Sequence, residues 1–363
     1  MLRRTVLALP LAAAACSRKS RGFRGYAFVA NEEGGAIAAV DLEIMAVAKH
    51  IPLEGAPAEV VSTATRPMVY ALTPGNGTVH EVDADQLRFT RKIAVAQSAV
   101  GMQLDAAETA LYVAAREPRA LIAIAPDTFQ IAWKLPLPAE PVELALAPNG
   151  KTAAVTFHNG VRLVDFTARH VSSPLSTGDF GPVRFLSDSK TLVAANRGER
   201  MLAVYDVASA RLISNLPVAV RPDNLCFNRD GGQLFVTGEG MDAVVVVYPY
   251  RTPEVAETVL AGHAPGAMAA SNSLLFVASP QSGDVSILNI PTRRVIAVVQ
   301  AGSDPGYVTV TPDDQYALVL NRKSGDVAVL RVGAITPNRN KTAALLTMIP
   351  VGSRPVSAAV RAI

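Results

Sequence analysis

Cysteine, aromatic residues and helical periodicity are all scarce in this 363-residue sequence. Its two cysteines are Cys16 and Cys226, so no network of disulfide bonds can hold the fold together. Aromatic residues make up 6% of the chain, and only one is tryptophan. Beyond the N-terminal region, no helical hydrophobic period continues for more than about a dozen residues. The sequence therefore excludes a disulfide scaffold and a helical bundle.

A strong net charge is also missing. The formal net charge is +3, and losing Arg3 and Arg4 with a cleaved leader would lower it to +1. A nearly neutral domain has no general electrostatic attraction for a polyanion. We therefore expect no nucleic-acid partner.

Several motifs that are typical of enzymes are absent from the sequence. The sequence contains no glycine-rich dinucleotide or P-loop pattern, no GxSxG nucleophile elbow, no HExxH zinc motif and no CxxCH haem attachment. The five histidines include no closely spaced pair that would indicate a metal site. These absences leave no residue that the sequence alone identifies as catalytic.

The first fifteen residues have the features of an export signal. Arg3 and Arg4 precede an apolar stretch over residues 5–15, which is too short to span a bilayer. Cys16 follows three alanines and resembles the lipidated cysteine of bacterial lipoproteins. We expect a signal peptide over residues 1–15, a lipid anchor at Cys16 and a polar tether over 16–25. This predicts a periplasmic or cell-surface protein held at a membrane.

The remainder of the chain favours β-structure. Half of all residues are apolar, and glycine and proline each occur 25 times. Short runs rich in valine, isoleucine and leucine alternate with these turn-forming residues. Residues 305–332 show the pattern most clearly, as three predicted strands joined by turns at 313–314 and 323–326. The composition therefore predicts an all-β fold.

This pattern recurs along the whole chain at intervals of about 42 residues. Equivalent predicted strands begin at Tyr26, Met68, Ala110, Thr152, Thr191, Gln233, Leu274 and Tyr316. Each is followed by a second and a third apolar segment. A fourth segment then begins at a proline in seven of the eight units, and at Ala99 in the other.

Four strands per unit of this length predict the blades of a β-propeller. The chain opens on the second strand of a blade, and residues 355–363 supply a first strand. The C-terminal strand should therefore complete the N-terminal blade and remove an open sheet edge. We predict one domain over residues 26–363 with eight blades. Seven remains the alternative if the short unit at 152–190 is irregular.

The repeat resembles that of the YVTN family of β-propellers. The segments NRKSGDVAVLRV and AGSDPGYVTVTPDDQYALVLN match its pattern most closely, and Asn31, Asn196 and Asn321 occupy the motif's asparagine position. The resemblance implies a propeller over residues 26–363. It does not imply a particular function, because the family includes surface-layer proteins and relatives of lactonases.

Candidate binding residues follow from the geometry of a propeller, in which the first strand of each blade lines the central channel. Residues two places after each proline should face this channel, whereas the apolar residues one place further should pack between blades. Charged residues just before the proline should surround the channel mouth. The resulting candidates for ligand binding are Glu59, Glu143, Arg184, Arg221, Asn224, His263, Asp304, Tyr307 and Arg354.

Three functions fit this arrangement. The first is a binding scaffold for a small ligand, a glycan or a protein, and we favour it over an enzyme. The second, a lactonase-like hydrolase, needs Glu59, Glu143, Asn224 and His263 to converge on one divalent metal. The third, haem binding or electron transfer, needs one axial histidine, and His158 and His263 are the candidates.

Overall fold

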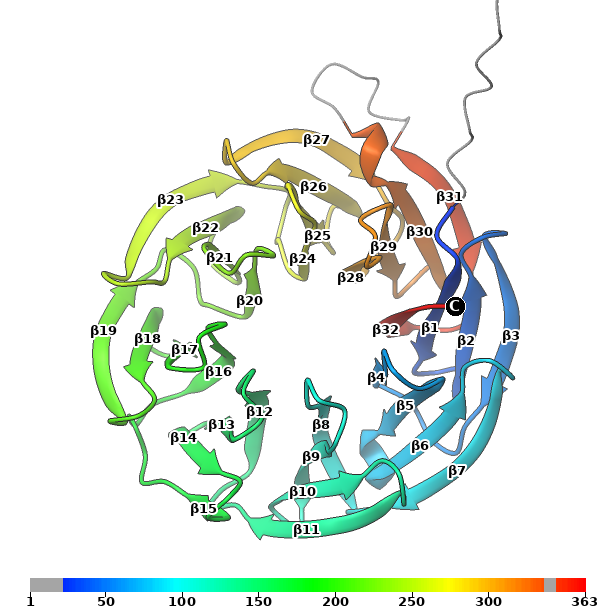
Figure 1. The fold of residues 1–363 in the computed structure, drawn as a ribbon. Helices are drawn as coiled ribbons and strands as arrows, with labels where there is room; N and C mark the ends of the chain where they lie inside the picture. Colours follow the sequence, from blue (N-terminus) through cyan, green and yellow to red (C-terminus); the bar gives the residue numbers. More distant parts are fainter. Residues whose placement is uncertain (1–21, 336–343) are drawn as a thin grey trace, which may run out of the picture.

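The computed structural model describes residues 22–335 and 344–363. It contains eight four-stranded antiparallel sheets, which follow one another around a ring (Figure 1). The predicted eight-bladed propeller is therefore confirmed, and the seven-bladed alternative is wrong. Within the described part of the chain, no helix has the length and apolar character needed to cross a membrane.

Each blade runs from an innermost strand at the channel to an outermost strand at the rim. In this order, blade 1 comprises β32 (Pro355–Ala362), β1 (Gly25–Asn31), β2 (Ala36–Asp41) and β3 (Ala46–Pro52). Blade 2 comprises β4 (Glu59–Ser62), β5 (Met68–Thr73), β6 (Thr78–Asp83) and β7 (Arg88–Ala94). Blade 3 comprises β8 (Ser98–Leu104), β9 (Leu111–Glu117), β10 (Ala120–Ala125) and β11 (Gln130–Pro136). Blade 4 comprises β12 (Pro141–Leu146), β13 (Thr152–Phe157), β14 (Gly160–Asp165) and β15 (His170–Val171).

The second half of the ring repeats this arrangement. Blade 5 comprises β16 (Phe180–Phe185), β17 (Thr191–Asn196), β18 (Met201–Asp206) and β19 (Arg211–Pro217). Blade 6 comprises β20 (Asn224–Phe227), β21 (Leu234–Thr237), β22 (Ala243–Tyr248) and β23 (Glu254–Leu260). Blade 7 comprises β24 (Met268–Ala270), β25 (Leu274–Ser279), β26 (Asp284–Asn289) and β27 (Arg294–Gln300). Blade 8 comprises β28 (Pro305–Val310), β29 (Tyr316–Asn321), β30 (Asp326–Arg331) and β31 (Leu345–Pro350), and two short 3-10 helices lie at Pro74–Asn76 and Val332–Ala334.

The ring closes through blade 1, as the sequence predicts. Strand β32 pairs antiparallel with β1, with Gly25 opposite Ala362 and Ala30 opposite Ser357. The two described ends of the chain therefore belong to one sheet. Without β32, the inner edge of β1 would expose unpaired backbone groups to solvent.

The ring has two faces, which differ in the loops they carry. The proline face carries the loops that precede the innermost strands, such as residues 351–354. The terminal face carries the loops that follow the innermost strands, such as residues 105–110, and it also holds Gly25 and Ala362. All innermost strands run from the proline face to the terminal face, because each blade repeats the same topology.

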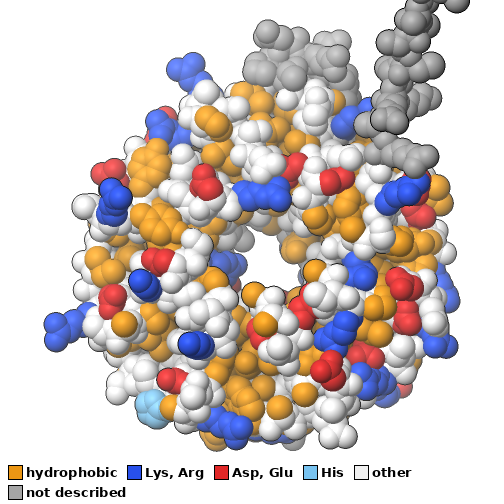
Figure 2. All heavy atoms as spheres, viewed as in Figure 1, with side chains coloured by type: hydrophobic (Ala, Val, Ile, Leu, Met, Phe, Trp, Pro, Cys, Tyr) orange, Lys and Arg blue, Asp and Glu red, His pale blue; other side chains and the backbone are white. Residues whose placement is uncertain are grey.

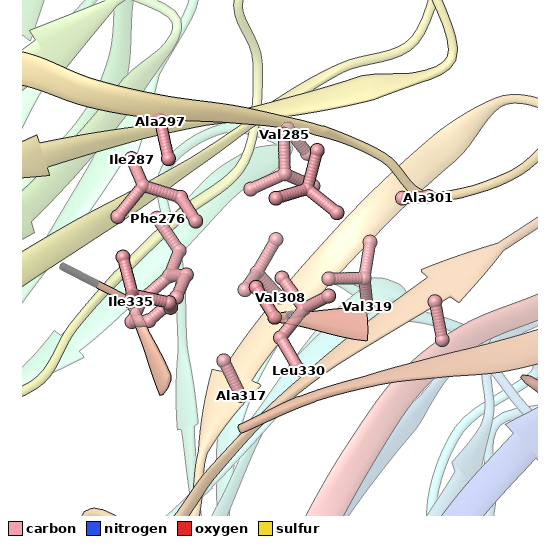
Figure 3. Close-up of a cluster of buried hydrophobic side chains, with 14 of the residues drawn as sticks. Phe276, Val285, Ile287, Ala297, Ala301, Val308, Ala317, Val319, Leu330 and Ile335 are labelled. Carbon is pink, nitrogen blue, oxygen red and sulfur yellow. The ribbon is translucent and has the colours of Figure 1, made fainter. Parts of the chain in front are cut away.

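The core lies between neighbouring blades. Middle strands such as β29 are buried along their whole length because adjacent blades cover both of their faces, which explains their nearly continuous apolar sequence. Outermost strands such as β7 instead leave many residues exposed. Figure 3 shows one inter-blade core, where Phe276 and Ile287 of blade 7 pack in the same cluster as Val319 and Leu330 of blade 8.

Two of the three motif asparagines join successive blades, whereas Asn196 bonds Glu199 of its own blade. Asn31 donates from Nδ2 to the carbonyl oxygen of Val351, at 2.7 Å, and Asn321 does the same to Ala301, at 2.8 Å. In both cases the acceptor follows the outermost strand of the preceding blade. Both asparagines are buried, so these hydrogen bonds satisfy polar groups that water cannot reach.

The aspartates at the ends of the third strands shape turns. Asp41 accepts a hydrogen bond at 2.8 Å from the backbone N–H of Glu43, and Asp165 accepts one at 2.8 Å from that of Thr167. Asp83 and Asp206 accept equivalent bonds. These carboxylates therefore have a structural role in the turns.

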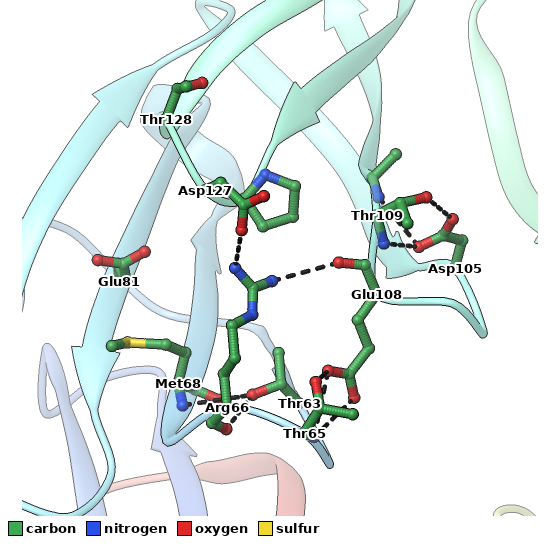
Figure 4. A network of polar contacts seen from close by, with 12 residues as sticks. Thr63, Thr65, Arg66, Met68, Glu81, Asp105, Glu108, Thr109, Asp127 and Thr128 are labelled. Carbon is green, nitrogen blue, oxygen red and sulfur yellow. Dashed lines mark hydrogen bonds and ion pairs between the residues drawn. The ribbon is translucent and has the colours of Figure 1, made fainter.

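A polar network on the terminal face joins blades 2 and 3 (Figure 4). The guanidinium of Arg66 contacts the carboxylate of Asp127 and donates to the carbonyl oxygen of Glu108 at 3.2 Å. The carboxylate of Glu108 accepts a hydrogen bond from the backbone N–H of Thr65 at 3.2 Å. These contacts fix the loop after β4 against the loop after β8, next to the channel.

Some predictions concern residues outside the described ranges. They are the signal peptide at 1–15, the lipidated Cys16 and most of the tether.

Candidate channel site

A repeated irregularity at the start of the innermost strands directs side chains into the channel. The pairing register shifts between Pro141 and Glu143 in blade 4, and between Pro305 and Tyr307 in blade 8. Such a bulge leaves one residue unpaired and re-aims the next side chain. It follows a residue that has no backbone N–H to offer the ladder. The local sequence therefore directs the side chain two places after the proline, such as Glu143 or Tyr307, toward the channel axis.

Four of the predicted residues meet in one cavity. Glu59 on β4, Glu143 on β12, Arg184 on β16 and Tyr307 on β28 all line a space of about 780 Å³, which we call the channel cavity. The space-filling view shows the centre of the ring open to solvent (Figure 2). Residues that are 248 positions apart in the sequence thus share one wall.

The channel cavity does not stop at this layer. Its wall continues past Gln103 on β8 to Asp105 and Glu108, in the loop that follows this strand. It therefore extends from the Glu59 layer to the terminal face. The sequence predicts a mouth on the proline face, but the cavity that these residues line reaches the opposite side.

Two of the four residues form an ion pair. The guanidinium of Arg184 contacts the carboxylate of Glu143, and Arg184 Nη1 also donates to the carbonyl oxygen of Val183 at 2.7 Å. Both side chains remain about one-third exposed to the channel. The charge of Glu143 is thus largely compensated within the wall.

Glu59 has a different environment. Its Oε2 accepts a hydrogen bond at 2.5 Å from the backbone N–H of Met102, and among the described residues it forms no salt bridge. Burial in the channel wall raises the pKa of Glu59 to about 7, and the negative charge of Glu143 adds to this rise. The Met102 hydrogen bond and Arg184 act in the opposite direction. Near neutral pH, Glu59 is therefore divided between its protonated and ionised forms.

Gly101 makes room for Glu59. It occupies the channel-facing position of blade 3, and a Cβ atom there would lie 3.3 Å from Oε2 of Glu59. Because Gly101 has no side chain, Glu59 reaches from blade 2 to the N–H of Met102 in blade 3. The gap at Gly101 also leaves space in the cavity between blades 2 and 4.

Tyr307 closes another part of the wall. Its hydroxyl donates at 3.2 Å to the carbonyl oxygen of Ala358, which holds the ring in place between blades 8 and 1. Burial raises the pKa of Tyr307, and the charge of Glu59 raises it further. Tyr307 therefore stays a neutral phenol, within electrostatic range of Glu59.

Three other predicted residues form ion pairs on the proline face. Arg221 contacts Glu239 at 3.2 Å, and Asp304 contacts Arg322 at 2.7 Å. Arg354 contacts Glu32 at 2.7 Å. Each pair links the loop before an innermost strand to a loop of the same blade. These groups already have partners of opposite charge, so they do not form a free set of ligand contacts.

The last two predicted residues lie in a second cavity. Asn224 and His263 line a space of about 660 Å³ on the proline face, between blades 6 and 7. The His263 Nδ1 atom lies 2.8 Å from Asp242 Oδ2, and this contact raises the pKa of His263. His158 forms an equivalent 2.8 Å contact with Asp179. Both histidines are mostly exposed.

The separation of the candidate residues into two cavities affects the hypothesis of a lactonase-like metal site. A shared metal needs Glu59, Glu143, Asn224 and His263 around one ion, but the structure places two of them in each cavity. Among the described residues, no three histidine, cysteine, aspartate or glutamate side chains are grouped so that they could hold a metal. Neither His158 nor His263 lines the channel cavity.

Two features of the cavity were not predicted from the sequence. Gln103 lines it and bridges two blades, donating to the carbonyl oxygen of Leu144 at 2.8 Å and accepting from the N–H of Leu146 at 3.0 Å. Strand alternation would have found Gln103, because it follows Gly101 by two places. The acidic loop residues Asp105 and Glu108 had no such signal.

Comparison with known proteins supports the architecture. No protein-family model matches the chain. A seven-bladed beta-propeller protein of Mycobacterium tuberculosis is 26% identical over 171 residues. The match covers 45% of this chain and 41% of the relative, so the chain aligns with about two fifths of that protein.

Several solved structures share this fold, and their names describe different kinds of protein. Hydrazine synthase of Kuenenia stuttgartiensis superposes with a TM-score of 0.60 and 21% identity, over 77% of this chain and 96% of that one. The dihydro-heme d1 dehydrogenase NirN, in complex with DHE, gives 0.73 and 12%, over 92% and 74%. A functionally unknown protein from Desulfotomaculum acetoxidans gives 0.64 and 11%, over 93% and 99%. At these identities the likeness concerns the fold, and this chain is an all-β, eight-bladed propeller.

Proposed function

We propose that this protein is a binding propeller that takes a small polar ligand into the channel cavity. The observation that supports this most is the convergence of Glu59, Glu143, Arg184 and Tyr307 on one space of about 780 Å³. Ligand sites are typically concave, of this order of size, and contain a few polar groups at fixed positions. Innermost strands of four blades hold these side chains around the cavity.

The cavity suits binding better than catalysis. Glu143 and Arg184 neutralise one another, Tyr307 is a neutral phenol, and Glu59 has no neighbouring nucleophile in the described contacts. A site with one ion pair and one carboxylate that lacks a cationic partner provides polar contacts for a ligand. It therefore favours recognition of a polar molecule.

Filling the cavity tests the proposal. A thermal-shift screen with a library of small anionic, neutral and cationic compounds would first identify stabilising ligands. The Gly101→Leu variant, whose side chain would occupy the gap beside Glu59, should lose their effect. Gly75→Leu is the matched control, because nothing lies within 4 Å of a Cβ at Gly75.

Two results of this screen would count against the proposal. One is a folded wild-type protein that no compound of any charge stabilises. The other is a set of ligands that stabilise Gly101→Leu as strongly as the wild type, which would place their site elsewhere.

We further propose that the protein is exported and anchored by a lipid at Cys16, with repeats of the YVTN type. The basic pair Arg3 and Arg4, the apolar run and the position of Cys16 support the export proposal. The buried hydrogen bonds that Asn31 and Asn321 donate to the preceding blade support the repeat type. Metabolic lipid labelling should fail in Cys16→Ser and persist in Cys226→Ser. Equal labelling of both variants would contradict the anchor.

A further inference from the structure

The groups on the wall of the channel cavity are not balanced in charge. Glu59 and Glu143 provide two carboxylates at the same layer, and Arg184 is the single basic side chain among the described residues that line the cavity. Because Arg184 is engaged with Glu143, ionised Glu59 adds a negative charge without a cationic partner. A partly buried charge of this kind is unfavourable until a counter-charge arrives.

The other acidic residues of the cavity have partners of their own. Asp105 accepts hydrogen bonds from the backbone N–H groups of Thr109, at 2.7 Å, and Ala110, at 3.0 Å. The carboxylate of Glu108 accepts hydrogen bonds from the backbone N–H groups of Ala64 and Thr65. They add negative potential at the terminal face, but Glu59 is the carboxylate with capacity for a new partner. A positively charged ligand would thus move toward Glu59.

We propose that the channel cavity selects small molecules carrying a protonated amine, with the ammonium group at Glu59. This inference rests on the proposed binding function and names its ligand class. The ammonium group donates to the Glu59 carboxylate, and the adjoining gap at Gly101 accommodates the body of the molecule. Tyr307 contributes an aromatic ring to the same wall, of the kind that favours contact with a cation.

Binding should depend on pH. Ligand and proton compete for the Glu59 carboxylate, and the pKa of this group is about 7. The charged or titratable groups that share its cavity are Glu143, Arg184, Tyr307, Asp105 and Glu108. A ligand that keeps its positive charge throughout should bind about tenfold more weakly at pH 6 than at pH 8, because the ionised fraction of Glu59 falls by about that factor.

Three probes of the same shape and different charge test the ligand class. They are benzylamine, benzyl alcohol and benzoate, and their dissociation constants for the whole chain would be measured by calorimetry at pH 8. Benzylamine should bind at least about tenfold more tightly than the other two. Glu59→Gln, which keeps the size of the side chain, should weaken benzylamine at least about tenfold, leave benzyl alcohol unchanged and not weaken benzoate.

Glu239→Gln is the matched control. Glu239 is an exposed carboxylate that contacts Arg221 on the proline face, outside the channel cavity. This variant should bind benzylamine as the wild type does. Repeating the wild-type titration at pH 6 provides a second measurement that needs no variant.

The remaining outcomes overturn the inference. They are equal binding of the three probes, benzylamine binding that survives Glu59→Gln, and no binding of any probe to folded protein. If neutral or anionic compounds bind and Gly101→Leu removes them, the binding function stands and the cationic class is wrong. If the library screen also finds nothing, the binding function itself fails.

Discussion

Glu59 and Glu143 show how one residue type takes two roles within the same channel wall. Glu143 meets a guanidinium, whereas Glu59 meets a backbone N–H and an empty position at Gly101. The sequence placed both residues at the channel because each lies two places after a proline. It could not reveal the difference, which depends on residues 41 and 43 positions further along the chain.

The first prediction concerns the pH dependence of stability. The pKa of Glu59 is raised from its ordinary 4.5 to about 7, so the folded protein holds this proton more tightly than the unfolded chain does. Between these pH values, stability should fall as pH rises, by about 2–3 kcal/mol from Glu59 alone. Glu59→Gln should remove this contribution. The free energy of unfolding of the variant, relative to that of the wild type, should therefore rise by about 2–3 kcal/mol from pH 5 to pH 8.

Urea unfolding of both proteins at pH 5 and pH 8 would measure the effect. Glu239→Gln controls for the general effect of removing a carboxylate. If the difference between Glu59→Gln and the wild type is the same at both pH values, the raised pKa is wrong.

The strands were predictable because each one begins and ends with a local signal. Proline opens the innermost strands, aspartate follows several third strands, and runs of aliphatic residues lie between them. All eight second strands begin within one residue of their predicted starts, from Tyr26 to Tyr316. What local signals could not provide is pairing between distant loops. Arg221, Asp304 and Arg354 were therefore predicted to bind a ligand, and in the structure each forms an ion pair with a loop residue.

Blade 4 is the element that departs most from the repeat. Its outermost strand β15 has two residues, and its pairing covers only Val164 and Asp165 of β14. Irregular contacts replace the missing strand, including a 2.9 Å hydrogen bond from Leu175 N–H to Val161. The short spacing of this unit in the sequence thus corresponds to a shortened outer strand, and the blade is still present.

The second prediction follows from this short strand. Backbone amides of residues 160–176 should exchange with deuterium faster than those of 201–217, the matching part of blade 5. The reason is that few ladder bonds protect the outer edge of blade 4. Hydrogen-exchange mass spectrometry would compare the two segments in one sample. Equal protection would show that the irregular contacts replace the strand fully.

At the scale of the whole molecule, stability depends on closing the ring. Each blade packs against two neighbours, and blade 1 has four strands only because β32 pairs with β1, next to β2 and β3. Repeat proteins without closure expose end units, whereas in this ring strand β32 completes the sheet that contains β1. The phase of the repeat predicted this closure from sequence, since the chain begins with a second strand and ends with a first.

The third prediction is that deletion of residues 355–363 opens the ring. The truncated protein should aggregate or lose its cooperative thermal transition, because β1 would present an unpaired edge next to an exposed core. Deletion of Ile363 alone, which is 75% exposed, should have little effect. Calorimetry and light scattering would compare the three proteins.

A rearranged chain would separate closure from simple loss of residues. Residues 355–363 would be moved in front of Arg24 through a turn of about two residues, as in a β-hairpin. Because Ile363 N–H already bonds to the carbonyl oxygen of Arg24 at 3.1 Å, this chain should fold and melt like the original. A truncated protein as stable as the full chain would contradict the closure.

The position of Gly25 and Ala362 on the terminal face also sets how the molecule would sit on a surface. If Cys16 carries the proposed lipid, the few residues before Phe23 can extend at most about 3.5 Å each, so this face would stand within roughly 25 Å of the bilayer. The channel cavity opens toward the same side. Its solutes would then come from the thin layer of fluid between the ring and the membrane, while the proline face would look outward, free to meet other macromolecules.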